Sequence, residues 1–220
     1  MSMPASIQAV LFDLDGTLAD SAPDLALALN LLLAEHGRDA VPLAITRPHT
    51  SSGARGLIKA GFGIDADHPD YPALKERFLD LYEQNLSVHT ALFEGVAAML
   101  DALEQRNIRW GIVTNKAKRF TGAVVAGIGL AERSACTVSG DTTAYAKPHP
   151  APLLHAAEQI NIAPAHCIYV GDDLRDIQAA RAAGMGALAA AYGYLGVDGD
   201  PHDWNADAVI TDPRELLNYL

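Results

Sequence analysis

Two aspartates directly follow a short apolar run near the N-terminus. The run covers residues 9–12. Asp13 and Asp15 follow it, and Gly16 and Thr17 come directly after Asp15. Carboxylates two residues apart at the end of a strand can approach one space, and a glycine lets the backbone turn there. Because two such carboxylates repel each other, the pair indicates a site for a divalent cation.

Further reactive side chains follow later apolar runs. They are, in chain order, Thr114, Asn115, Lys147, Asp172, Asp173 and Asp176. A few protein oxygens, completed by water and a substrate phosphate, are the usual way in which Mg²⁺ is held. Thr114 and Lys147 offer a hydroxyl and a cation to phosphoryl oxygens. A nucleophile, an acid/base group, a metal and a cation are what phosphoryl transfer needs.

A parallel sheet would bring these side chains together, because the carboxyl ends of parallel strands meet at one edge, where ligands bind. Short apolar runs predict strands buried on both faces, and helical patterns lie between most of them. The alternation predicts an α/β fold with a Rossmann-like parallel sheet as its core. The expected strands are 9–12, 108–115, 135–140, 166–172, 186–193 and 208–211, and the expected helices are 95–106, 117–128, 150–160 and 173–183.

The segment from residue 20 to residue 90 breaks this alternation. It contains helical patterns at 23–36, 54–60 and 72–87, with no convincing strand. Proline and glycine between the patterns indicate short helices joined by turns. We therefore expect an α-helical cap domain at 20–90, inserted into a core domain made of 1–19 and 91–220.

Each motif alone is weak, since an isolated D-x-D is usually a solvated turn. Their order is specific: 13-DLDGT-17, Thr114-Asn115, Lys147-Pro148 and 171-GDDLRD-176 each lie at or shortly after a predicted strand end. In this the chain resembles the haloacid dehalogenase (HAD) superfamily, of the phosphoglycolate phosphatase type, from about Ile7 to the C-terminus. The resemblance implies a HAD fold and a phosphoric monoester hydrolase.

The resemblance also implies roles for single residues. Asp13 would be the nucleophile that forms an aspartyl-phosphate, and Asp15 the acid that protonates the leaving alkoxide and later activates water. Thr114, Asn115 and Lys147 would bind the phosphate. Mg²⁺ would be held by Asp13, the main-chain carbonyl of Asp15, and Asp172. Asp173 and Asp176 would stand behind these ligands, and Asp173 departs from the Ser or Thr of many relatives.

The cap is expected to recognise the leaving group. Within 51-SSGAR-55, Ser52 offers a hydroxyl, Gly53 allows close backbone approach, and Arg55 can pair with a substrate carboxylate. The alternative is a plain helix start, with Ser52 as N-cap and Arg55 in solvent. In the phosphoglycolate phosphatase type, a cap contact with substrate lies at this segment, which favours a specificity loop.

The substrate remains open between two esters. The strings 109-RWGIVTNK-116, 129-GLAERSA-135 and 171-GDDLRDI-177 also resemble N-acetylmuramic acid 6-phosphate phosphatases of cell-wall recycling. Both esters carry a carboxylate besides the phosphate, so the partner is expected to be a small carboxylated phosphate monoester. A phosphomutase of the β-phosphoglucomutase kind uses the same core and remains an alternative. A non-catalytic phosphate-sensing module is disfavoured, because Asp13, Asp15 and Lys147 are all present.

Composition excludes several other partners. The net charge of −11 repels nucleic acid and anionic lipid, so an anionic substrate needs a local cluster of cations. No run of apolar residues is long enough for a membrane span. Residues 1–8 lack the basic and apolar character of an export signal, so a cytoplasmic protein is expected. Cys136 and Cys167 are expected to be ordinary buried thiols.

Overall fold

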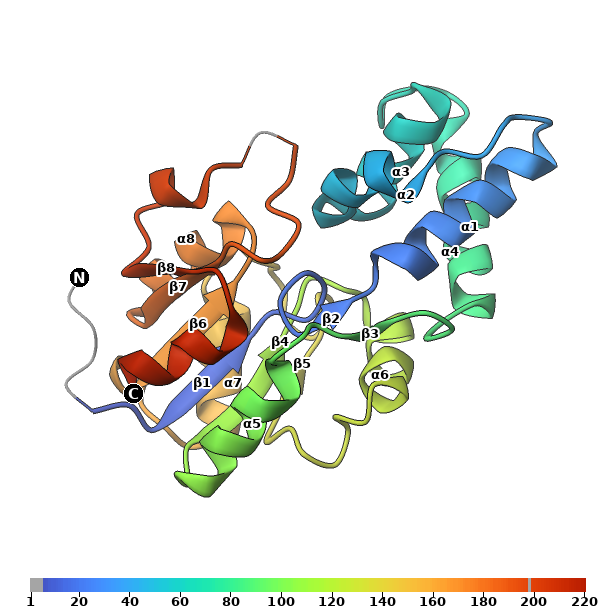
Figure 1. Ribbon diagram of the computed structural model, residues 1–220. Helices are drawn as coiled ribbons and strands as arrows, with labels where there is room; N and C mark the ends of the chain where they lie inside the picture. Colours follow the sequence, from blue (N-terminus) through green and yellow to red (C-terminus); the bar gives the residue numbers. More distant parts are fainter. Residues whose placement is uncertain (1–5, 198) are drawn as a thin grey trace.

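A computed structural model describes residues 6–197 and 199–220. Its elements alternate largely as expected, with the longest helical stretch between β2 and β3 (Figure 1). They are β1 (Ala9–Phe12), β2 (Ala19–Asp20), α1 (Ala22–Glu35), α2 (Leu43–Thr46), η1 (Arg47–Ser52), α3 (Gly53–Phe62), α4 (Tyr71–Gln84), β3 (Ala91–Leu92), α5 (Val96–Gln105), β4 (Arg109–Val113), α6 (Lys118–Gly127), β5 (Thr137–Val138), α7 (Ala151–Gln159), η2 (Pro164–His166), β6 (Cys167–Gly171), α8 (Leu174–Ala183), β7 (Gly186–Ala190), η3 (Pro201–Asp203), β8 (Ala208–Ile210) and η4 (Pro213–Tyr219).

The core is a six-stranded parallel sheet in the order β5-β4-β1-β6-β7-β8, which confirms the predicted α/β class. The first strand lies in the middle, with Phe12 opposite Ile112 of β4 and Val170 of β6. Because the three strands are parallel and in this register, the residues after β1, β4 and β6 emerge side by side. The sheet therefore brings Asp13, Thr114 and Asp172 to one edge.

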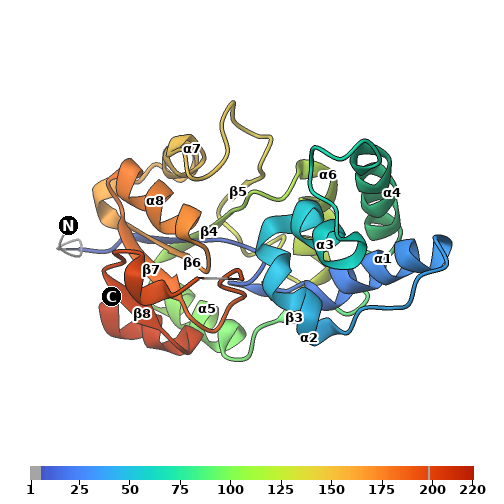
Figure 2. The same cartoon turned by 90° about the horizontal axis from the view of Figure 1, so that it is seen from above.

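Both faces of the sheet are covered by helices. Val10 and Phe12 pack into the cluster under α5 and η4, and Ala9 and Leu11 pack into the cluster under α7 and α8. Figure 2 shows these two helix pairs on opposite sides of the strands. Full burial of a Leu or Phe side chain contributes about 1.5–3 kcal/mol, so β1 is fixed from both faces. The apolar run that precedes Asp13 thus anchors that aspartate.

Helices α1, α3 and α4 form a separate apolar cluster beyond the carboxyl edge of the sheet (Figure 1). Leu29, Leu57 and Phe78 from the three helices lie in its centre, each at most 1 % exposed. The three helices lie within residues 20–90, the segment in which a helical cap was expected, and this segment is called the helical insert below. The division into a core of 1–19 and 91–220 and a cap of 20–90 stays a prediction. The strands β2 and β3 pair at the two points where the chain passes from the expected core into the expected cap and back.

A buried carboxylate links the chain that enters the helical insert with the chain that leaves it. Asp24, near the start of α1, accepts hydrogen bonds from the backbone N–H groups of His89 (2.8 Å) and Thr90 (2.9 Å) and from the Thr90 hydroxyl (2.6 Å). A carboxylate removed from water needs such donors, and here they come from the returning segment. Asp24 thereby joins the outgoing and returning chains beside β2 and β3.

The structure differs from the predicted elements mainly in short segments. The expected strand 135–140 is reduced to the two residues of β5, at the edge of the sheet. Residues 43–52 form α2 and η1, and residues 213–219 form η4, none of which was predicted. Segments this short carry too little periodicity to be recognised, because tertiary contacts decide their conformation.

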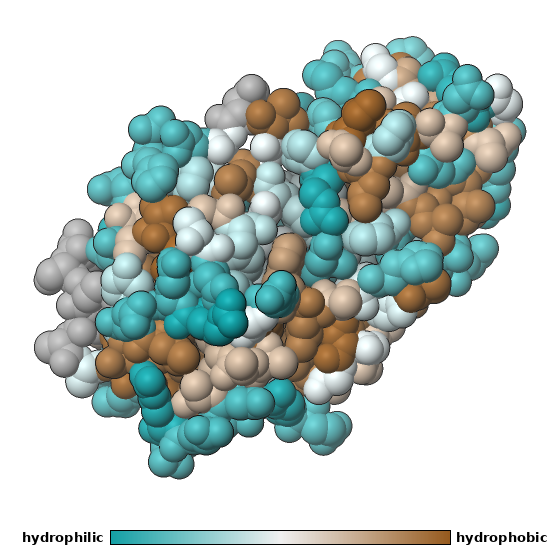
Figure 3. Space-filling view, in the orientation of Figure 1, coloured by the Kyte–Doolittle hydropathy of each residue, from teal (hydrophilic) through white to brown (hydrophobic). Residues whose placement is uncertain are grey.

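Within the described residues, none of the helices combines the length and apolar character that a membrane span requires. On the face drawn in Figure 3, hydrophobic areas alternate with hydrophilic ones.

Candidate active site

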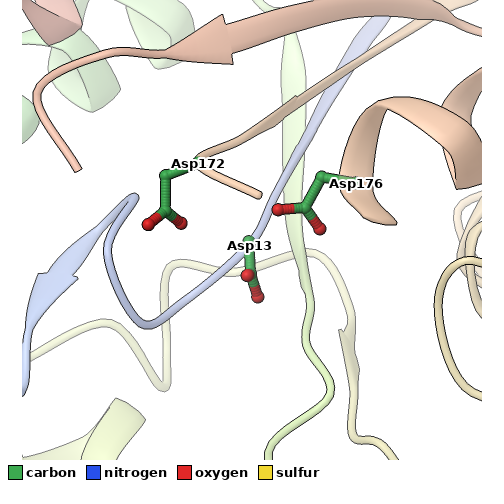
Figure 4. Close-up of side chains that lie close together, drawn as sticks. All are labelled: Asp13, Asp172 and Asp176. Atoms are coloured by element: carbon green, nitrogen blue, oxygen red, sulfur yellow. The ribbon is translucent and has the colours of Figure 1, made fainter. Parts of the chain in front are cut away.

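Three carboxylates converge at the carboxyl edge of the sheet. Asp13 follows β1, Asp172 follows β6, and Asp176 lies in the first turn of α8. One oxygen from each lies within 4.8 Å of the others, and Figure 4 shows the three side chains around one space. The edge predicted from the sequence thus gathers an acidic triad.

Two glycines leave the room that Asp172 occupies. Gly16 has φ +88°, and a Cβ there would lie 2.1 Å from an Asp172 carboxylate oxygen. A Cβ on Gly193 would lie 2.3 Å from the Cβ of Asp172. The carboxylate itself accepts hydrogen bonds from the Thr17 hydroxyl (3.1 Å) and the Tyr194 backbone N–H (2.9 Å). The D-x-D-G-T turn and the loop after β7 therefore enclose Asp172.

The triad fits a divalent cation. Burial, together with the nearby Asp13 and Asp176, raises the pKa of Asp172 well above its usual value. Burial likewise raises the pKa of Asp176 to about 7, although Lys147 opposes the rise. Such a set of carboxylates is unfavourable when ionised and alone, and a cation coordinated by these hard oxygens relieves the repulsion.

Asp176 has a place in this cluster that the sequence did not assign to it. It was expected behind the metal ligands, yet its oxygens lie as close to the shared space as those of Asp13 and Asp172. The expected ligand at Asp15 was its main-chain carbonyl, and the Asp15 side chain takes no part in the triad.

The amine of Lys147 lies between the carboxylates of Asp13 and Asp176. Its amine is 3.0 Å from Asp13 and 2.7 Å from Asp176, and it donates hydrogen bonds to the Val113 carbonyl and the Tyr169 hydroxyl. Burial acts to lower the pKa of Lys147, but the two carboxylates raise it above its ordinary value. The side chain is therefore a buried ammonium that faces the triad.

Asn115 holds Lys147 by its backbone. The Asn115 amide donates to the Lys147 carbonyl, and its oxygen accepts from the Lys147 N–H, both at 2.9 Å. Thr114 is buried at the pocket, and its hydroxyl accepts from the Lys116 N–H at 3.1 Å. Of the predicted phosphate binders, Lys147 presents its side chain to the triad and Thr114 lines the cavity, whereas the Asn115 side chain is engaged in positioning.

Asp15 has a partner that the sequence analysis missed. The Lys116 amine lies 3.0 and 3.2 Å from the two Asp15 oxygens, and the Ser21 hydroxyl also donates to Asp15. The same amine lies 4.7 Å from the centre of the Tyr82 ring of α4. Burial opposes the Lys116 charge, yet Asp15 and Tyr82 raise its pKa. The adjacency of Lys116 to Thr114-Asn115 was the available signal.

A cavity of about 380 Å³ connects these groups with the helical insert. The insert contributes Ser52 and Gly53 from the predicted 51–55 segment, whereas Arg55 is exposed and does not line the cavity. Ser52 stands at the N-cap position of α3 but makes no capping hydrogen bond. Side chains from α1, α4 and α6 close the remaining wall: Leu25, Lys75, Phe78, Leu79, Tyr82 and Phe120.

Asp173 has a structural partner in Arg175. Its carboxylate caps α8 and lies 2.8 Å from the Arg175 guanidinium, which also donates to the Ser51 carbonyl at 2.7 Å. Burial works against the Asp173 charge, but Arg175 holds its pKa below the usual value. The pair links the sheet edge to η1, and Arg175 is a second pocket residue that the sequence analysis did not single out.

Tyr194 connects the triad with the crossing strands. Besides its backbone bond to Asp172, its hydroxyl accepts from the Ala22 N–H (2.9 Å) and donates to Asp20 of β2 (3.0 Å). Asp20 is also paired with Arg47 of η1, at 2.8 Å. The loop after β7 therefore contacts both the acidic triad and the helical insert.

Comparison with known proteins finds relatives along nearly the whole chain. A family model described as haloacid dehalogenase-like hydrolase matches residues 7–184. A phosphoglycolate phosphatase of Xanthomonas campestris is 47 % identical over 210 residues, covering 95 % of this chain and 94 % of that protein. An N-acetylmuramic acid 6-phosphate phosphatase of Pseudomonas putida is 42 % identical over 214 residues, covering 97 % and 96 %.

The fold is also similar to solved structures. The crystal structure of a predicted phosphoglycolate phosphatase from Haemophilus somnus superposes with a TM-score of 0.84 at 26 % identity, over 96 % of this chain and 97 % of that one. The similarity includes both the sheet and the helical insert, because nearly all of each chain is covered.

Proposed function

Because the chain belongs to the haloacid dehalogenase-like hydrolase family, we propose that it is a Mg²⁺-dependent phosphatase of small carboxylated phosphate monoesters. The observation that carries the proposal is the position of Asp13, which lies 3.0 Å from the buried Lys147 amine and within the acidic triad. A nucleophile beside a fixed cation and a cation-binding cluster is the arrangement that phosphoryl transfer requires.

In the first step, an Asp13 oxygen attacks phosphorus and the bond from phosphorus to the ester oxygen breaks. Asp15, when protonated, donates its proton to the departing alkoxide, and Asp13 carries the phosphoryl group. Asp15 then accepts a proton from water as the water oxygen attacks phosphorus. Inorganic phosphate leaves, and the Asp13 carboxylate is restored.

The charge of the phosphoryl group is met by several groups of this chain. Lys147 offers a fixed ammonium, and the Thr114 hydroxyl lines the same cavity. Mg²⁺, held by Asp13 and Asp172 with Asp176 beside them and the Asp15 carbonyl as a further ligand, would neutralise phosphoryl oxygens when bound. When bound there, the cation would also reduce the repulsion between the ester and the Asp13 carboxylate.

Two substrates fit the class. The relatives bear the names of phosphoglycolate phosphatase and N-acetylmuramic acid 6-phosphate phosphatase, and the two named substrates combine a phosphate with a carboxylate. Either ester places its phosphate at Asp13 and its organic part toward the helical insert, near Ser52 and Gly53.

Phosphate release from a panel of esters tests the proposal. The panel contains both named substrates and a β-hexose 1-phosphate, each with Mg²⁺ and with chelator. Release that depends on Mg²⁺ and is concentrated on a carboxylated ester supports the phosphatase. Isomerisation of the hexose phosphate without net phosphate release would instead identify a phosphomutase, and no turnover of any ester would favour a non-catalytic phosphate-binding role.

A further inference from the structure

One face of α4 forms a continuous wall of the cavity. Lys75, Phe78, Leu79 and Tyr82 all line it, at relative positions i, i+3, i+4 and i+7. This spacing places side chains along one side of a helix. The stripe combines three apolar or aromatic groups with a cation at its N-terminal end.

Lys75 differs from the other cations of the cavity. Lys116 is paired with Asp15, Lys147 with Asp13 and Asp176, and Arg175 with Asp173. Across residues 6–197 and 199–220, Lys75 forms no ion pair, although carboxylates are abundant around it on α4. A cation that lines a substrate cavity without an internal partner is free to receive an anionic group of the ligand.

The position of Lys75 along α4 sets the distance between the two anionic groups of the ligand. Tyr82 marks the catalytic end of the stripe, because its ring lies 4.7 Å from the Lys116 amine, which contacts Asp15. Lys75 lies seven residues earlier, about 10 Å along the helix axis at a rise of about 1.5 Å per residue. Helical side chains lean toward the N-terminus, which carries the Lys75 amine further from Asp15.

From this geometry we propose that Lys75 is a specificity-determining residue, which pairs with a substrate carboxylate lying well beyond the phosphate, while the partly exposed Leu79 contacts the carbon skeleton between the two anionic groups. The proposal rests on the phosphatase function above and narrows its substrate class to phosphorylated sugar acids. In phosphoglycolate the phosphorus and the carboxylate carbon are only about 4 Å apart, so the carboxylate of that ester would lie nearer the Tyr82 end of the stripe than the Lys75 end.

The character of the wall supports the same class. A sugar ring has apolar C–H faces that pack on aliphatic side chains, and Leu79, which is partly exposed in this wall, offers such a surface. A two-carbon acid has no comparable surface and would leave this wall and most of the 380 Å³ unfilled. Arg55, the cation expected from the sequence to meet the carboxylate, lies outside the cavity.

A matched pair of esters isolates the carboxylate. N-acetylmuramic acid 6-phosphate and N-acetylglucosamine 6-phosphate share the sugar and the phosphate, and differ by the lactyl ether that carries the carboxylate. Steady-state kinetics on both esters, with phosphoglycolate as a third, compares wild type with Lys75→Gln, Lys75→Arg and the control Lys59→Gln. Lys59 is a cap lysine that pairs with Asp65 on the surface, away from the cavity.

For Lys75→Gln we expect kcat/KM on the carboxylated sugar to fall about tenfold, mainly through KM, as for a lost charged hydrogen bond. The N-acetylglucosamine ester and phosphoglycolate should change less than twofold. Lys75→Arg should retain most of the activity, and Lys59→Gln should match wild type on all three.

Other outcomes overturn the assignment. Equal losses on both sugars, no loss on either, or a larger loss with Arg55→Gln than with Lys75→Gln would remove Lys75 as the carboxylate partner. A wild-type enzyme that hydrolyses phosphoglycolate but not the sugar acid ester also overturns it, while the phosphatase function stands. Absence of phosphate release from every ester would instead contradict the proposed function itself.

Discussion

The amine of Lys116 lies 3.0 Å from a carboxylate oxygen of Asp15, and the lysine side chain is only 6 % exposed. The pair holds the proposed acid/base group in one orientation, and Tyr82 brings α4 against the same amine. Lys116 thereby connects the helical insert to the proposed acid/base residue.

Replacing Lys116 should affect turnover more than binding. In Lys116→Met, Asp15 loses its fixed partner but stays in place, and we expect kcat to fall about tenfold to a hundredfold, at most the lower end of what a positioned acid/base group usually contributes. Steady-state kinetics on the best ester measures the effect. Lys118→Met, at the exposed start of α6, is the control and should match wild type. An unchanged kcat in Lys116→Met would show that the ion pair does not position Asp15.

Gly16 should be intolerant of a methyl group, because the added Cβ would lie 2.1 Å from an Asp172 oxygen. Gly129 has a similarly positive φ (+75°) but nothing within 4 Å of its Cβ position. Gly129→Ala should therefore cost only the backbone strain of about 1 kcal/mol, whereas Gly16→Ala should cost about 3 kcal/mol and displace Asp172. Urea unfolding of the two variants makes the comparison, and equal losses would mean that the turn does not press on Asp172.

The edge of the sheet was predictable from the sequence because buried strands have a simple signature. The runs before Asp13 and Asp172 are continuous and apolar, and parallel strand ends meet, so these aspartates could be placed together without coordinates. Lys147 followed from the same order of motifs.

Side-chain partners were less predictable, since they depend on the direction in which each side chain leaves the backbone. Asn115 lines the cavity, as a phosphate ligand would, but its side-chain amide is hydrogen-bonded to the Lys147 backbone. Arg55 and Lys75 are both cap cations, and only the helical register decides that Lys75 faces the cavity. The short elements β2, β3 and α2 carry no periodicity, so packing alone determines them.

Metal binding should stabilise the protein through the acidic triad. At a Mg²⁺ concentration about a hundredfold above Kd, the free energy of unfolding should rise by about 2.7 kcal/mol. In Asp172→Asn this increase should be largely lost, while the metal-free variant should be at least as stable as wild type because a buried repulsion is removed. Thermal unfolding with Mg²⁺ and with chelator measures both quantities. Asp39→Asn, an exposed aspartate, is the control.

One outcome would contradict the triad as the metal site. A Mg²⁺-induced shift of full size in Asp172→Asn would place the cation elsewhere.

The two thiols should be unreactive in the folded protein. Both cysteines are buried and free, as expected from the sequence, and burial raises the pKa of Cys136 and of Cys167 to about 11. At pH 8 only about one thiol in a thousand would be ionised, and the thiolate is the reactive form. Ellman's reagent should therefore detect no thiol in minutes under native conditions, and two per chain in guanidinium. Rapid native labelling would show that one of the two is accessible.

Phosphate release by Asp13→Asn tests the central claim most directly. The substitution keeps the shape of the side chain and leaves Lys147 its second partner, Asp176, at 2.7 Å. We predict that kcat falls at least about a thousandfold, as for loss of a nucleophile, with the far-ultraviolet circular dichroism spectrum and the unfolding midpoint close to wild type. Release within tenfold of the wild-type rate by the folded variant would contradict an aspartyl-phosphate on Asp13.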